Sequence, residues 1–70
     1  MDYQMTTLSP TTFFDTKHKT ADAMTQFGGG FVQGLAIALR RADRHNAAVL
    51  QEAFADLIAP YAPGGRFHQE

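Results

Sequence analysis

The clearest hydrophobic pattern in the chain lies between residues 30 and 42 and has the period of an α-helix. At about 100° per residue, its apolar residues share one side of a helical wheel, with Gln33 and Arg40 opposite them. These apolar residues are Phe31, Val32, Leu35, Ala38, Leu39 and Ala42. The pattern predicts an amphipathic helix over 30–42. Ile37 lies outside the apolar face, where it is either an ordinary exposed residue or part of a second contact.

A second apolar pattern lies between residues 44 and 59 and covers about half of a helical wheel. Its members are Ala47, Val49, Leu50, Ala53, Phe54, Leu57 and Ile58. Asp43 is expected to cap this second helix, because an aspartate side chain accepts hydrogen bonds from the free N–H groups of a first turn. Pro60 ends it, since proline lacks the donor N–H. The large side chains predicted to be buried are Leu39, Leu50, Phe54 and Leu57.

The segment before these two helices has no sustained period, so residues 1–19 are predicted to form an irregular N-terminal arm. Within it, Ser9 and Pro10 suit a single helical turn, as cap and first helical residue. Thr20 is the expected cap of a further helical start. The glycines at 28–30 favour a main helix that begins near or after them, because a glycine inside a helix costs about 0.8–1.0 kcal/mol relative to alanine.

These elements predict an all-α fold. Two helices joined by a short connection form an antiparallel hairpin or a corner, and we expect a helical hairpin over 20–61 followed by a flexible tail over 62–70. One partner helix cannot cover the wide apolar arc of the second helix, which favours a homodimer with a four-helix arrangement. The alternative is a monomer in which aromatic residues of the arm and tail cover this arc: Phe13, Phe14, Tyr61 and Phe67.

Composition narrows the functional class. The chain has 70 residues, no cysteine, and six basic against seven acidic residues, a net charge of −1. A core this small is marginal and has no disulfide to stabilise it. The balanced charge argues against nucleic-acid binding, since such proteins usually carry a basic excess. No apolar run approaches the roughly 18 residues of a membrane span, and the first residues lack a signal-peptide pattern. We therefore expect a cytoplasmic protein.

Residues that carry chemistry are sparse. His18, His45 and His68 stand far apart with no thiol partner, so we predict neither a metal site nor a cofactor. No histidine has the spacing of a nucleophile and base pair, and a hairpin this small lacks room for a substrate pocket of about 300 Å³ or more. We therefore expect a protein that is not an enzyme. The glycine run lacks the context of a phosphate loop, which leaves a hinge or a site of close backbone packing.

Arg40, Arg41 and Arg44 form the main basic cluster, together with His45. Arginines at the end of a helix complement the negative end of its dipole. Phosphate contacts at a helix junction and contacts with a protein partner are the alternatives for this cluster.

Residues 27–58 resemble a type of small protein found in tailed phages and prophages. In that type, an F-x-x-x-L-A-x-A-L-x-x-A-D-x-x-N segment precedes a second helix that ends in A-F-x-x-L. Here the first motif runs over 31–46 and the second over 53–57. Such proteins commonly carry a proline directly after the aspartate, where this chain has Arg44.

The resemblance implies a class of action, because small phage accessory proteins often bind and block a host protein. The expected function is to inhibit or modulate a bacterial host protein, as an anti-defence protein or an antagonist of a host regulator. The alternatives are a nucleic-acid-associated transcriptional regulator and a structural or assembly component of the virion. Aromatic and arginine anchors supply most of the energy of protein interfaces. On this basis the candidate partner-binding residues are Phe13, Phe14, Ile37, Arg40, Arg41 and Arg44.

Overall fold

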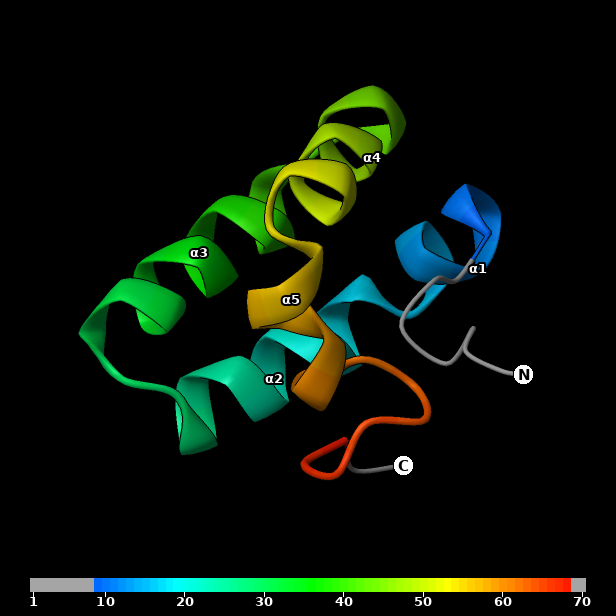
Figure 1. Cartoon of the computed structure of the whole chain (residues 1–70). Helices are drawn as coiled ribbons and strands as arrows, with labels where there is room; N and C mark the ends of the chain where they lie inside the picture. The colour runs from blue at the N-terminus through cyan, green and yellow to red at the C-terminus, as the bar shows by residue number, and fades with distance from the viewer. Residues whose placement is uncertain (1–8, 69–70) are drawn as a thin grey trace.

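Helices are the regular secondary structure of the part of the chain that the computed structural model describes, residues 9–68 (Figure 1). In chain order they are α1 (Pro10–Asp15), α2 (Lys17–Phe27), α3 (Gly30–Arg41), α4 (Arg44–Ala53), α5 (Ala55–Ile58) and the 3₁₀ helix η2 (Ala59–Tyr61). No strand occurs within residues 9–68. The prediction of an all-α fold is confirmed for this part of the chain.

Helix α1 begins at the predicted cap. The Ser9 Oγ accepts a hydrogen bond from the N–H of Thr12 at 3.2 Å, and Pro10 takes the first helical position, where its missing N–H costs nothing. The irregular arm predicted over 1–19 is therefore wrong from residue 10 onward, while residues 1–8 lie outside the described part. The reason is length, because a helix of six residues is too short to show a period.

Helix α2 begins at Lys17 rather than at the expected cap Thr20, whose side chain is fully buried inside the helix. At its other end, Gly28 and Gly29 form an extended connection to α3. The prediction that the main helix begins near or after the glycines is confirmed, because α3 begins at Gly30. A Cβ atom on Gly28 would overlap the side chain of Val32, so Gly28 is a site of close packing.

A capped corner of two extended residues, Ala42 and Asp43, joins α3 to α4. The Asp43 Oδ1 accepts a hydrogen bond from the N–H of Asn46 at 2.8 Å, which confirms the predicted cap. The predicted second helix is divided at Phe54, where the backbone leaves helical geometry at φ −123° and ψ 33°. Pro60 does end the α-helical run, and the chain continues through it as η2.

The helices pack in two pairs, α2 against α3 and α1 against α4. In Figure 1, α2 lies beside α3 in the lower left, and α1 faces α4 on the upper right. The predicted antiparallel hairpin of α3 and α4 is therefore not one of the closely packed pairs. These two helices meet at a corner, the other form expected from their short connection, because the chain changes direction at Ala42 and Asp43.

Small side chains make up much of the core. The buried apolar residues are Phe13, Ala21, Ala23, Met24, Ala36, Leu39, Ala42, Ala47, Ile58 and Ala62. The predicted burial of Leu39 is confirmed, while Leu50 and Phe54 are half-buried against this core. The predicted burial of Leu57 is wrong, because the break at Phe54 changes the helical phase and leaves Leu57 42% exposed.

The segment after η2 folds back onto the helices. The ring of Phe67 stacks on Tyr61 at 5.4 Å and on Phe27 at 5.1 Å between centroids. The Phe67 N–H donates a hydrogen bond to the carbonyl oxygen of Pro60 at 2.8 Å. Phe67 therefore folds back onto α2 and η2. Up to residue 68, the predicted flexible tail is a packed turn, because its aromatic ring has partners in α2 and η2.

Candidate protein-binding surfaces

The predicted partner-binding residues lie in separate places, and the first of them is not on the surface. Phe13 is 1% exposed and belongs to the core. The prediction that it offers an exposed anchor is wrong, because α1 packs against α4 and turns this ring inward. Phe13 instead packs in the core, which is the other role expected of the aromatic residues in the arm.

Phe14 lies half-buried beneath two cations. The Arg44 Cζ lies 4.7 Å from the centroid of its ring, and the Lys17 Nζ lies 5.0 Å from the same centroid. A cation over an aromatic face is attracted by the ring quadrupole, by roughly 0.5–1 kcal/mol at an exposed site. This contact places Arg44 beside α1, and the residue is exposed to solvent.

Lys17 is a buried lysine whose side chain reaches from α2 to the end of α3. Its side chain is nearly fully buried, and its Nζ donates hydrogen bonds to the carbonyl oxygens of Arg40 at 3.0 Å and of Ala42 at 2.5 Å. These carbonyls lie at the C-terminal end of α3, which lacks helical N–H partners and carries partial negative charge. Lys17 is therefore a structural residue that joins the start of α2 to the end of α3.

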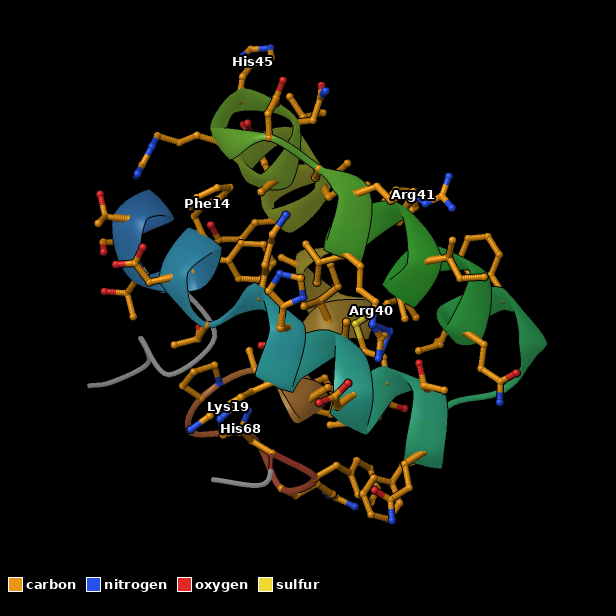
Figure 2. All side chains as sticks on the ribbon, turned by 180° about the vertical axis from the view of Figure 1, so that it is seen from behind. Phe14, Lys19, Arg40, Arg41, His45 and His68 are labelled. Atoms are coloured by element: carbon orange, nitrogen blue, oxygen red, sulfur yellow. The ribbon has the colours of Figure 1, made fainter. Side chains whose placement is uncertain are left out.

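Arg40 points toward α2 rather than to open solvent. Its Nη2 lies 2.5 Å from the Asp22 Oδ1 in an ion pair, and its Nη1 donates to the Thr25 hydroxyl at 3.5 Å. Figure 2 shows Arg40 over α2 and well separated from both Phe14 and Arg41. The predicted cluster of arginines is thus divided, because residues 40 and 41 lie on different sides of one helix.

Ile37 and Arg41 share a surface that we name the α3 outer face. It consists of exposed residues that recur at intervals of three and four along α3: Gly30, Phe31, Gly34, Ile37, Ala38 and Arg41. Phe31 is 63% exposed and Ile37 60% exposed, the two highest values among the large apolar residues of the described chain. The expectation that Ile37 lies outside the buried face is confirmed.

A second exposed surface lies on α4. We name as the α4 outer face the residues His45, Val49 and Ala53, which are each one turn apart and all exposed. Val49 is 48% exposed. It is the large apolar residue of this face, and His45 lies one helical turn before it. Arg44 and Phe14 lie at the same end of α4 as His45.

The pattern in the sequence misassigned part of α3. The helical pattern predicts Phe31 and Ala38 on the buried side with Leu39, whereas the structure exposes Phe31 and Ala38 and buries Ala36 beside Leu39. The buried side is rotated because α3 packs against α2 rather than against α4. A sequence signal for the outer face does exist, since Gly30, Gly34 and Ala38 are small residues at intervals of four.

Other site classes find no support within residues 9–68. No group of three or more histidine or acidic side chains lies together there in a way that suits a metal ion. None of the helices in this range is long and apolar enough to span a bilayer. The described chain does present exposed apolar side chains on α3 and α4, among them Phe31, Ile37 and Val49.

Comparisons of the chain with protein-family models, with curated proteins and with solved structures found no match.

Proposed function

We propose that this chain is a small protein of the phage or prophage type that binds a bacterial host protein and inhibits or modulates it, in the cytoplasm of that host. The observation that supports this best is the exposure of large apolar side chains on a protein whose core is mostly alanine. These exposed residues are Phe27, Phe31, Ile37, Val49 and Leu57. Exposed apolar surface bordered by polar residues is typical of interaction sites.

The host protein is proposed to bind at the α4 outer face and at Arg44, the first residue of the same helix. Val49 supplies the apolar centre, and Arg44, held over Phe14, supplies a charged anchor in a fixed position. Anchors that are already positioned lose little conformational entropy on binding, and arginine is among the residues that contribute most to interface energies. We also propose a homodimer. The α3 outer face is exposed and is not among the residues proposed to bind the host protein.

Affinity purification tests this proposal. The tagged protein is incubated with a bacterial host lysate, in parallel with the variants Val49→Asp and Arg44→Ala. We expect one host protein in stoichiometric amount with the wild type, and its loss with either variant. His18→Asp is the matched control, because it introduces the same charge at an exposed position near the start of α2.

Two outcomes would point to another function. If nucleic acid is recovered instead, with binding that weakens steeply as salt rises, the chain is a nucleic-acid-associated regulator, since counterion release gives phosphate contacts that dependence. If neither a host protein nor nucleic acid is retained, and mass spectrometry finds the chain in purified virions, it is a virion component.

A further inference from the structure

We infer that the α3 outer face binds a second copy of this chain, with the two α3 helices packed antiparallel about a two-fold axis. This inference deepens the proposed function, on which it rests for the role of exposed apolar faces, by naming the partner of one face. It assigns Ile37, Phe31 and Arg41 to self-association and leaves the α4 outer face for the host protein.

Two glycines on this face, Gly30 and Gly34, are not required by the packing of a single chain. A Cβ atom on Gly30 or Gly34 would meet nothing within 4 Å, and neither residue has a positive φ. Gly34 lies inside α3, where glycine is a poorer helix former than alanine. Gly28 differs, because its own chain fills the space where a side chain would stand. A helix that approaches closely from outside accounts for a bare backbone at Gly34.

The large residues of the face are placed to fill the space over the small ones. In α3, residues 34 and 37 lie equally far from the helix midpoint on either side of it, and residues 30 and 41 do the same. A two-fold axis at the midpoint of antiparallel helices therefore sets Ile37 against Gly34 of the second copy. Such an interface is isologous, and one face serves both partners. A host protein would have no need of this symmetry.

Charge favours the antiparallel over the parallel arrangement. Parallel packing would bring the two Arg41 guanidinium groups together at one end, and like charges repel. Antiparallel packing brings Arg41 to the opposite end, beside the Phe31 ring of the second copy, where a cation over an aromatic face is attracted. It also sets the two helix dipoles in opposite directions. The same residues therefore favour one orientation over the other.

The α4 outer face does not have these properties. Val49 is its large apolar residue, Glu52 is exposed nearby, and no helical glycine lies in α4. The wide apolar arc of this region is in fact divided between the core and the surface, since Ala47 and Ile58 are buried. The α3 outer face is therefore better suited to a dimer interface than the α4 outer face.

The first experiment measures mass by light scattering coupled to size exclusion, over a dilution series, for wild type and Gly34→Leu. We expect the wild type at micromolar concentration to have about twice the mass of the 7.7 kDa chain. A Cβ atom at residue 34 meets nothing within 4 Å in its own chain, so Gly34→Leu places a large side chain in the space of the second helix. We expect it to weaken dimerisation by about tenfold or more while circular dichroism shows unchanged helix content. Ala53→Leu, the same side chain added on α4, should leave the dimer intact.

The second experiment uses the absence of cysteine from the chain. Ile37→Cys and Val49→Cys each place one thiol on an exposed helical position. In the antiparallel pair the two copies of residue 37 lie close to the two-fold axis, one on either side of it, so oxidation or a short thiol cross-linker should join Ile37→Cys chains at low concentration. Val49→Cys should stay uncross-linked under the same conditions.

A monomeric mass at every concentration would overturn the inference. So would a dimer that survives Gly34→Leu and cross-links through Val49→Cys, which would place the interface on α4. These results are independent of the host partner, because capture of a host protein is measured with Val49→Asp and Arg44→Ala. A Gly34→Leu chain that is monomeric and still captures the host protein would confirm that the two faces have different partners.

Discussion

The two sides of α3 differ in what the fold needs from them. The inner side carries Ala36 and Leu39, both without exposed surface, and packs against α2. The outer side carries Phe31 and Ile37, both more than half exposed, around two glycines where an added Cβ atom would meet nothing within 4 Å. The inner side therefore stabilises the chain, whereas the outer side is available to a partner. Substitutions on each side should separate these roles.

The largest effect is expected from Leu39→Ala. Leu39 is fully buried, so its truncation leaves a cavity in a small core and should lower the free energy of unfolding by about 2–5 kcal/mol. Ile37→Ala is the matched substitution on the outer side. It should change the stability of the monomer by no more than about 0.5 kcal/mol. Denaturation in urea, followed by circular dichroism at a concentration that gives monomer, measures both. Equal effects would abolish the distinction between the two sides.

A somewhat smaller effect is expected from Lys17→Met, which tests the hydrogen bonds at the C-terminal end of α3. Methionine keeps the length of the side chain but removes both hydrogen bonds to the end of α3. Leaving the buried Ala42 carbonyl and the partly buried Arg40 carbonyl without this partner should cost about 1–3 kcal/mol. Lys19→Met, at an exposed position of the same helix, should be nearly neutral. A neutral Lys17→Met in the same urea series would show that water replaces the ammonium group at these carbonyls.

Lys17 also shows which parts of the fold local patterns predict. The helix near 30–42 and the Asp43 cap are visible in the sequence because each depends on residues within one or two turns. The Lys17 bonds to Arg40 and Ala42 join residues 23 and 25 positions apart. No hydrophobic period or cap motif in the sequence reports such a contact. The local patterns therefore do not predict the pairing of α2 with α3.

The candidate site follows the same division. Exposure of Ile37 was predicted, since it depends only on the phase of one helix. The burial of Phe13 and the pairing of Arg40 with Asp22 depend on which helices become neighbours, and the sequence gives no measure of that. Thr20 is instructive, because its residue type suits a cap while its place inside α2 leaves a buried hydroxyl without a hydrogen-bond partner.

A local effect of intermediate size is expected at the corner that follows α3. Asp43→Ala removes the side-chain acceptor for the Asn46 N–H and should lower the free energy of unfolding by about 0.5–2 kcal/mol. Asp43→Asn keeps an acceptor and should recover most of that loss. Thermal melts of the three proteins decide the matter. If both variants lose the same stability, the carboxylate charge matters and the cap geometry does not.

The smallest effect has the opposite sign and comes from the outer side of α3. Gly34→Ala adds a methyl group that meets nothing in its own chain and improves helix propensity, so the monomer should gain about 0.8–1.0 kcal/mol. Ala38→Gly is the reverse change on the same face and should lose a similar amount. Ala36→Gly, on the inner side, should lose more than Ala38→Gly, because it also removes a buried methyl group from the core. Urea denaturation of dilute protein gives all three values. Equal losses for Ala36→Gly and Ala38→Gly would mean that only backbone propensity matters at both positions, whereas a larger loss at Ala36 would confirm that the inner side alone supports the fold.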